Sequence, residues 1–248
     1  DKYIINILSR GYGRKSKGFQ IANKSSNPNY LGDEPFMFYK QNQNIRVGVC
    51  NRRREGIQRL TKFIDKNSKN IFILDDVYQH RWVKPSIMIL LTEYSKPYFK
   101  DYLFPSGNLR ESRNSARRAD VIIVTKCPSE LPIEERKKFI TKLNIDLNQK
   151  VFFTKIKYDE HIFGKSKKLP LNILKKVPFI LVTGIADNTL LVKELKMRGL
   201  VFKTINYKDH FTYTKKNINK ITSFSDGNLI LTTEKDYYKL QDHMNSDL

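Results

Sequence analysis

Two adjacent aspartates, Asp75 and Asp76, follow directly after the apolar run Ile71–Leu74, and His80 lies four residues after the second. A buried parallel strand delivers its C-terminal residues to the sheet edge where α/β proteins bind ligands. Carboxylates at that edge are suited to hold Mg²⁺ beside phosphate groups. Aspartates that cap the next element or pair with arginines give the same pattern. The doublet therefore predicts metal-assisted phosphate chemistry, with the structural alternative left open.

The stretch "LSRGYGRK" follows the first predicted strand and provides a loop that can approach a ligand closely. Its glycines Gly11 and Gly13 carry no side chain, and the flanking Arg10 and Arg14 offer positive charge to a phosphate. The loop lacks the G-x-x-x-x-G-K-[ST] spacing of a Walker A motif, and no other segment of these 248 residues has it. By itself the loop is equally well read as an ordinary turn.

Two further segments combine acids with arginines. "GDEP" places Asp33 and Glu34 in a turn, which by itself reads as solvent-exposed. In "FPSGNLRESRNSARRAD" an arginine, Arg110, lies beside Glu111, so that a phosphate ligand and a metal ligand are adjacent. Arg113 and Arg117 share a face if the stretch is helical. A surface ion-pair network explains this second segment equally well.

Three other groups have weaker signals. "NRRREG", which contains Arg53, is a basic cluster of a kind that is more often solvated. Asp209 and His210 follow a predicted strand, where a histidine can assist a carboxylate base or act as one. The C-terminal "LTTEKDYYKL" predicts a strand followed by charged residues, without an assigned role.

Short β-rich runs alternate with helical stretches along the chain, which predicts an α/β fold. Several of the runs are continuously apolar, as in parallel strands buried on both faces. One helix is predicted to start near Pro132, and another follows Asn188 as its N-cap and stops near Gly199. The predicted strands are Tyr3–Leu8, Arg46–Cys50, Asn70–Leu74, Ser86–Leu91, Val121–Thr125, Val151–Ile156, Phe179–Thr183, Val201–Ile205 and Leu229–Thr232.

A polar, lysine-rich stretch at 157–177 is predicted to connect a larger part, 1–156, with a smaller α/β part, 178–248. The net charge of +21 favours polyanionic partners such as nucleic acid, nucleotide phosphates or an anionic membrane, although a general abundance of lysine would also produce it. Two distant cysteines give no disulfide framework. No apolar run is long enough to span a bilayer.

The ordered set LSRGYGRK, GDEP, LDDVYQH, GNLRE, ADVIIVTK, GIADN, KDHF and TTEKD resembles the landmarks of the tetraacyldisaccharide 4'-kinase (lipid A 4'-kinase) family. The resemblance covers the chain from about Tyr3 to Leu240. It implies a P-loop-NTPase-like, mostly parallel sheet flanked by helices, in which 1–156 forms the core kinase domain. The implied reaction transfers the γ-phosphate of ATP, with Mg²⁺, to the 4'-hydroxyl of a tetraacyl-glucosamine-disaccharide 1-phosphate. The product is lipid IVA, made in lipid A biosynthesis.

The resemblance also implies roles for particular residues. Asp33 corresponds to the base that activates the acceptor hydroxyl, and His210 to its supporting partner. Asp75 and Asp76 match the Walker B aspartates, and Glu111 matches a further acid beside Mg²⁺. The remaining implied residues contact the phosphates or shape the acceptor site: Arg10, Gly11, Tyr12, Gly13, Arg14, Arg53, Gln79, His80 and Arg110. The implied location is peripheral, on the cytoplasmic side of the bacterial inner membrane.

The family carries its Walker A loop upstream of the "LSRGYG" strand, and these 248 residues do not include it. We therefore expect little or no kinase activity from them by themselves. The expected partners are the lipid A disaccharide precursor and an anionic membrane surface, with no nucleic acid and no protein partner indicated. Two alternatives remain: a non-catalytic lipid-binding remnant of the family, and a basic nucleic-acid-binding protein whose affinity falls steeply with salt.

Overall fold

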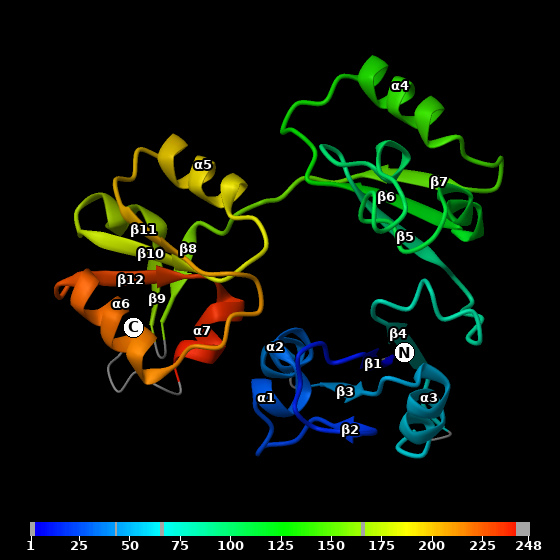
Figure 1. Ribbon diagram of the computed structural model, residues 1–248, viewed down its shortest axis with the longest axis horizontal. Helices are drawn as coiled ribbons and strands as arrows, with labels where there is room; N and C mark the ends of the chain where they lie inside the picture. The colour runs from blue at the N-terminus through cyan, green and yellow to red at the C-terminus, as the bar shows by residue number, and fades with distance from the viewer. Residues whose placement is uncertain (1–2, 43, 65–66, 165–166, 242–248) are drawn as a thin grey trace. The chain divides into compact units, whose positions relative to one another are not determined.

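The computed structural model describes residues 3–42, 44–64, 67–164 and 167–241 (Figure 1). The chain divides into two compact units, one formed by Asp1–Asp75 with Asp159–Leu248 and the other by Asp76–Tyr158. The chain returns from the second unit to the first between Tyr158 and Asp159, which lie within the predicted connector at 157–177. The predicted division into 1–156 and 178–248 itself stays a prediction.

The N-terminal part of the first unit is a four-stranded sheet in the order β2-β3-β1-β4. Strands β1 (Ile4–Ser9), β3 (Ile45–Val49) and β4 (Asn70–Leu74) are parallel, and the short β2 (Gln20–Ile21) pairs antiparallel with β3. Parallel strands end at a common edge, which gathers the residues that follow them. The accompanying helices are α1 (Pro28–Leu31), α2 (Asp33–Gln41) and α3 (Arg53–Thr61).

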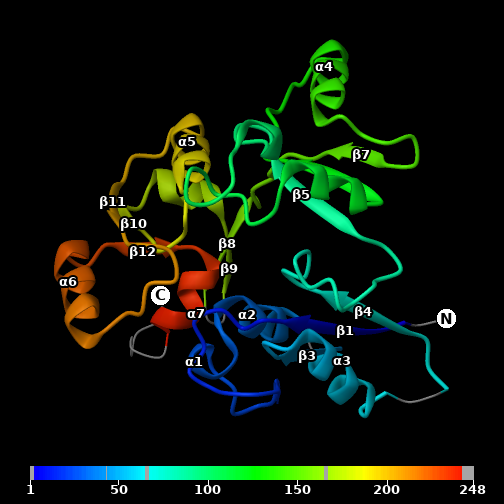
Figure 2. The same cartoon turned by 45° about the vertical axis from the view of Figure 1, so that its right-hand side comes forward.

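The C-terminal part of the first unit is a parallel sheet in the order β11-β10-β12, covered by helices on both faces (Figure 2). Leu181 of the central strand packs with the helix α5, whereas Val182 packs with α6 and α7, because successive strand residues point to opposite faces. The elements are β8 (His161–Phe163), β9 (Lys168–Pro170), η3 (Leu171–Lys175), β10 (Phe179–Thr183), α5 (Thr189–Met197), β11 (Lys203–Asn206), α6 (Lys215–Ser225), β12 (Leu229–Thr232) and α7 (Glu234–Leu240).

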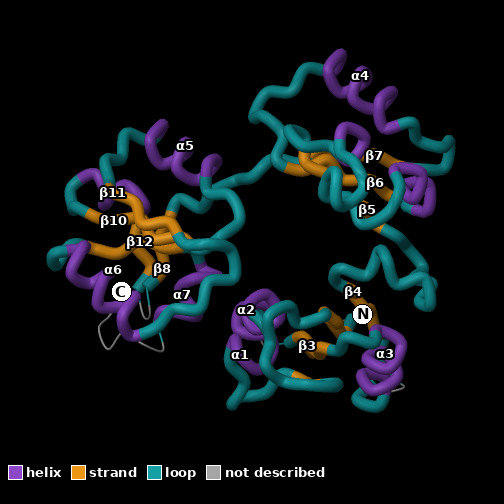
Figure 3. The backbone as a smooth tube through the Cα atoms, viewed as in Figure 1, coloured by secondary structure: helices purple, strands orange, loops and turns teal. Residues whose placement is uncertain are grey.

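The second unit is built on a parallel sheet in the order β5-β6-β7. Its core includes Ile122 and Val124 from the central strand with Phe139 and Leu143 from α4, so the helix buries one face of the sheet. Figure 3 shows these strands in orange and the helices in purple. The elements are β5 (Ile89–Glu93), η1 (Tyr98–Lys100), η2 (Arg113–Arg118), β6 (Val121–Thr125), α4 (Ile133–Leu143) and β7 (Lys150–Phe153).

The α/β prediction is confirmed, and β4, β6, β10 and β12 have the predicted bounds. Burial on both faces is confirmed for β10, in which all five residues are buried. It is wrong for β4, where Ile71 and Ile73 are 42% and 47% exposed. Successive side chains of a strand point to opposite faces, and the face of β4 that carries Ile71 and Ile73 is the exposed one. An apolar run alone does not show whether both faces of a strand are covered.

Two local predictions also differ from the structure. Asn188 occupies the N-cap position of α5 but makes no side-chain cap bond, because its amide donates to the side chains of Thr183 and Asn206. Arg113 and Arg117 do not share an α-helical face, because Arg113–Arg118 is a 3₁₀ helix. With three residues per turn, this helix separates positions that an α-helix would align.

Candidate active site

The carboxyl ends of β1, β3 and β4 meet around Asp75. The Ser9 hydroxyl at the end of β1 donates to Asp75 Oδ2 at 2.8 Å. Arg53, on the first turn of α3, donates to the backbone oxygens of Cys50 at 2.6 Å and Asp75 at 3.1 Å. The predicted solvent exposure of this basic cluster is wrong for Arg53, which is only 1% exposed. Its guanidinium ties two strand ends together, and its predicted phosphate contact stays a prediction.

Asp76 begins the second unit in a left-handed conformation, with φ of 47°. Arg110 Nη1 lies 3.3 and 3.2 Å from its two carboxylate oxygens, which confirms that an acid of the doublet pairs with an arginine. Gln79 and His80 lie in the turn that follows, where the His80 N–H donates to the backbone oxygen of Val77. Asp76 and Arg110 are 48% and 63% exposed, so both remain accessible to a phosphate or a cation.

Glu111 lies among arginine side chains, only some of which could be singled out from the sequence. Its carboxylate accepts from Arg118 at 2.5 Å and lies 3.6 Å from Arg81. Arg118 also lies over the ring of Tyr78, with 4.7 Å from Cζ to the ring centroid. Burial raises the pKa of Tyr78, although the cation of Arg118 opposes the rise. Neither Arg118 nor Arg81 has a sequence signal beyond its membership in a basic segment.

The predicted magnesium ligands are Asp75 in the first unit, and Asp76 and Glu111 in the second. All three offer carboxylate oxygens, which are the donors that Mg²⁺ prefers, so the chemistry of the donor set fits this ion. Within the described ranges, no three His, Cys, Asp or Glu side chains gather closely enough to hold a metal. The magnesium assignment therefore stays a prediction.

The glycine loop after β1 packs against the GDEP turn. Gly11 and Gly32 have φ of 69° and 95°, in the left-handed region that favours glycine. A Cβ on Gly11 would lie 2.6 Å from the Leu31 carbonyl, and one on Gly32 would lie 2.9 Å from the Tyr12 carbonyl. The two segments can therefore approach each other only as glycine backbones.

The arginines of this loop differ in their surroundings. Arg14 donates to the Ser16 hydroxyl at 3.0 Å and to the Gly18 carbonyl at 2.6 Å. Burial lowers the pKa of its guanidinium. Arg10 is exposed at the surface. Arg14 thus shapes the loop, whereas Arg10 makes its predicted surface loop more positively charged, and the predicted ligand contacts of both stay predictions.

We expect Gly32→Ala to destabilise the first unit and displace the glycine loop. Gly32 has φ of 95° and ψ of 156°, a conformation that is essentially restricted to glycine, so alanine there costs about 1–3 kcal/mol. The clash with the Tyr12 carbonyl adds about 1–3 kcal/mol. Gly18→Ala is the matched control, because Gly18 has φ of 65° but its Cβ would meet nothing within 4 Å. Urea denaturation of both variants measures the difference, and equal losses would contradict the close approach.

Asp33 forms the centre of a cluster of charged side chains. It opens α2, and its Oδ2 lies 3.1 Å from His210 Nδ1 and 3.0 Å from Lys239 Nζ. The side chains of Asp33, His210 and Lys239 are 14%, 24% and 8% exposed, respectively. The ring of Tyr12, from the glycine loop, lies 4.9 Å from that of His210. The structure thus brings together three predicted site residues and one that was missed, Lys239.

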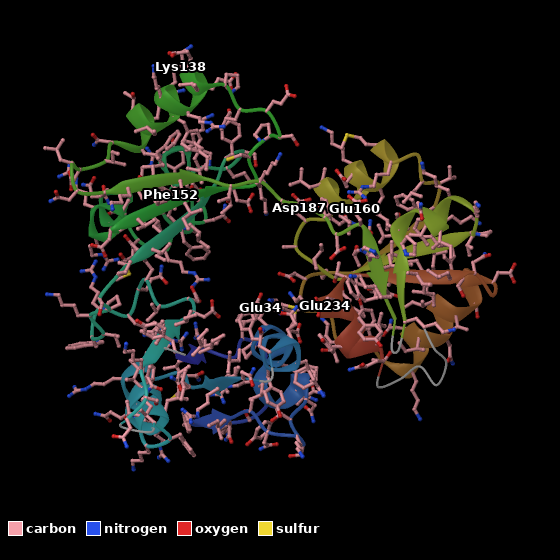
Figure 4. All side chains as sticks on the ribbon, turned by 180° about the vertical axis from the view of Figure 1, so that it is seen from behind. Glu34, Lys138, Phe152, Glu160, Asp187 and Glu234 are labelled. Atoms are coloured by element: carbon pink, nitrogen blue, oxygen red, sulfur yellow. The ribbon has the colours of Figure 1, made fainter. Side chains whose placement is uncertain are left out.

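The contact between α2 and α7 forms this cluster, since Asp33 opens the first helix and Lys239 lies on the second. Figure 4 labels their exposed neighbours Glu34 and Glu234, and Gln41 of α2 donates to Glu234 Oε2 at 2.7 Å. His210 has φ of 55°, a left-handed conformation that non-glycine residues adopt infrequently. Its ring is therefore held toward Asp33 by an uncommon backbone conformation.

A second layer of contacts supports the cluster. Asp209 lies 3.7 Å from His210 Nε2 and accepts from Lys235 Nζ at 2.7 Å. Burial opposes ionisation of Asp209, but its interactions with Lys235 and His210 together outweigh that effect and lower its pKa. Tyr213, whose hydroxyl donates to the buried Asp236 at 3.1 Å, has a raised pKa because of burial and the nearby carboxylate.

Chemically, the cluster presents an ionisable carboxylate at a helix N-terminus with two nitrogen donors on one of its oxygens. Such a carboxylate can accept a proton from a hydroxyl while its neighbours hold its orientation. Within the described part of the chain, no helix is long and apolar enough to cross a bilayer. The arrangement alone does not identify the hydroxyl.

Comparison with known proteins identifies the family. The family model described as tetraacyldisaccharide-1-P 4'-kinase (LpxK) matches residues 1–248. The chain belongs to this family. It is 43% identical to the tetraacyldisaccharide 4'-kinase of Flavobacterium psychrophilum, over 100% of this chain and 71% of the relative. It is 40% identical to the enzyme of that name from Flavobacterium johnsoniae, over 98% and 70% of the two chains.

A solved structure extends the comparison to three dimensions. The crystal structure of LpxK from Aquifex aeolicus in complex with ATP matches with a TM-score of 0.70 and 29% identity, covering 98% of this chain and 72% of that chain. The family resemblance and the P-loop kinase fold that it implies are therefore confirmed. The LpxK roles that the resemblance implies for single residues, including Asp33 and His210, stay predictions.

Proposed function

We propose that this chain activates the acceptor in the reaction of an ATP-dependent 4'-kinase of lipid A biosynthesis. The acceptor is the tetraacyl-glucosamine-disaccharide 1-phosphate, and the product is lipid IVA. Membership in the family and the ATP complex of the Aquifex aeolicus relative support this proposal. The observation that carries it is the Asp33–His210 pair at 3.1 Å, which joins two family landmarks separated by 177 residues.

In the proposed reaction, Asp33 takes the proton from the 4'-hydroxyl as its oxygen bonds to the γ-phosphorus. The bond from that phosphorus to the β,γ-bridging oxygen breaks, and ADP leaves. His210 contacts the carboxylate through Oδ2 and so limits its rotation while Asp33 acts as the base. Phosphoryl transfer depends mainly on positioning and on neutralising the charge on the phosphate oxygens. Arg10 and Arg110 are exposed cations that can contribute to this neutralisation.

Asp75, Asp76 and Glu111 would hold the magnesium ion, which supplies positive charge to the phosphates of ATP. Ser9 fixes the carboxylate of Asp75, and the Arg53 guanidinium fixes its carbonyl. Arg118 and Arg81 orient Glu111. Each of these acids therefore has a partner in the chain that limits its rotation.

The deciding experiment is 4'-phosphorylation of the tetraacyldisaccharide 1-phosphate by ATP and Mg²⁺. The 248-residue chain is compared with a form extended upstream in its own reading frame. We expect the extended form to make lipid IVA. That the 248 residues by themselves give little or no turnover stays a prediction, which the same assay tests. Failure of both forms, with disaccharide binding that is indifferent to ATP, would overturn the proposal in favour of a lipid-binding remnant.

We further propose that the protein acts at the cytoplasmic face of the inner membrane, attracted by its charge of +21. We expect cosedimentation with vesicles of phosphatidylglycerol and phosphatidylcholine, and a decrease in binding as salt rises from about 0.1 to 1 M. Pure phosphatidylcholine vesicles are the control. Equal binding to both vesicle types, or binding insensitive to salt, would contradict an electrostatic attachment.

A further inference from the structure

Lys239 is a buried cation in the segment "TTEKDYYKL", for which the sequence suggested no role. Its side chain is 8% exposed. Its Nζ lies 3.0 Å from Asp33 Oδ2, 3.1 Å from the Phe211 carbonyl and 3.6 Å from Asp236 Oδ1. A buried ammonium is costly unless it is paired and hydrogen-bonded, so these three oxygens fix its position.

Hydrogen bonds of Asp236 hold α7, the helix that carries Lys239, in place. Asp236, one turn before Lys239, is fully buried and accepts hydrogen bonds from the Gly184 backbone at 2.8 Å, the Thr233 hydroxyl at 2.7 Å and Tyr213. These bonds hold the helix against the C-terminal sheet. Because α7 is held in this way, the backbone from which the Lys239 side chain extends toward Asp33 is held as well.

Lys239 and His210 bind the same oxygen of Asp33. Because both nitrogens lie within 3.1 Å of Oδ2, rotation of the carboxylate would break both contacts. Among the described residues, none donates a side-chain hydrogen bond to Oδ1. Two donors on one oxygen thus leave the other available to a substrate hydroxyl.

We propose that Lys239 is a positioning residue that holds the Asp33 carboxylate, together with His210, so that Oδ1 faces the acceptor hydroxyl. This inference rests on the proposed function. It links the end of α7 to the reacting group at the start of α2, and it gives a role to a side chain that is only 8% exposed. The charged and titratable side chains around the pair are His210, Asp209, Lys235, Asp236 and Tyr213.

The first test uses the form of the enzyme that turns over in the assay above. We expect Lys239→Met to lower kcat by about 10–100-fold, since loss of orientation affects the chemical step. KM for ATP and for the disaccharide should stay within about twofold. Lys239→Arg keeps the charge and should regain part of kcat. Lys196→Met, at an exposed site on α5, is the control.

The second test needs no activity and uses the 248-residue chain. The melting temperatures of Asp33→Asn, Lys239→Gln and the double variant form a cycle. Each single change should lower the melting temperature by about 2–4 °C or more, and the double variant should lose less than the sum. An additive cycle overturns the inference even if the enzyme is active.

The outcomes separate this inference from the proposed function. An active wild type with a fully active Lys239→Met variant overturns the positioning role and leaves the kinase function intact. A wild type that makes no lipid IVA overturns the proposed function, and the positioning role falls with it. A non-additive cycle would then identify only a structural ion pair. A fall in kcat with KM retained and partial rescue by arginine supports the inference.

Discussion

Replacing Asp33 with asparagine is expected to lower kcat for lipid IVA formation by about 10²–10⁴-fold, the usual contribution of a general base. Asparagine has the shape of aspartate but cannot accept the hydroxyl proton. It also removes the negative charge that His210 and Lys239 share through Oδ2. The steady-state rate of the extended enzyme, at saturating ATP and disaccharide, measures the effect.

Glu34→Gln is the matched control for this prediction. Glu34, which is labelled in Figure 4, is the next residue of the same helix turn, and it is exposed. The same loss of charge there should change kcat by less than about twofold, since surface substitutions away from a site have small effects. An Asp33→Asn enzyme that retains kcat within about threefold would show that another group accepts the proton.

The sequence was informative where one segment alone determines the structure. Continuous apolar runs such as Phe179–Thr183 predicted strands with the observed bounds. The residues at strand ends, including Asp75, were correctly placed at the edge of a parallel sheet, where Ser9 contacts them. Both features follow from local periodicity and from the direction of parallel strands.

The Asp33 cluster could not be predicted from local chemistry. Asp33 and His210 are 177 residues apart, and each looks like an ordinary surface residue in its own segment. Only the resemblance to the kinase family implied that these two residues act together, because a tertiary contact between distant elements has no local sequence pattern. Lys239 and Asp236 have even less in their local sequence to mark them as part of the cluster. The Thr233-x-x-Asp236 spacing predicts a helix start, but it does not reveal a buried carboxylate.

Residues from two of the family landmarks, and one that follows a third, meet at that buried carboxylate. Gly184 of GIADN donates its N–H to Asp236 Oδ2, and a Cβ there would lie 2.8 Å from Oδ1. Thr233 of TTEKD donates to Oδ2, while Tyr213, which follows KDHF, donates to Oδ1. The landmarks are thus separate in sequence but form one hydrogen-bond network around Asp236. This network gives Gly184 of GIADN, and Thr233 and Asp236 of TTEKD, a structural role.

Replacement of Asp236 by asparagine is therefore expected to lower the free energy of unfolding by about 3–5 kcal/mol, as for other buried charge pairs that lose one partner. The asparagine amide would turn an N–H₂ group toward donors, either the Gly184 N–H and the Thr233 hydroxyl or Tyr213 and Lys239. No rotamer of the amide satisfies all four. The buried Lys239 would also lose the nearby negative charge.

Urea denaturation of the 248-residue chain, followed by circular dichroism, measures this loss. Glu234→Gln is the control, because Glu234 lies on the same helix and loses the same charge but is exposed (Figure 4). The control should change the free energy of unfolding by at most about 0.5 kcal/mol. Equal stabilities of the two variants would show that α7 is held mainly by apolar contacts such as those of Leu240. A large loss at Asp236 alone would show that a polar network holds α7, and with it the ammonium that contacts the proposed catalytic base.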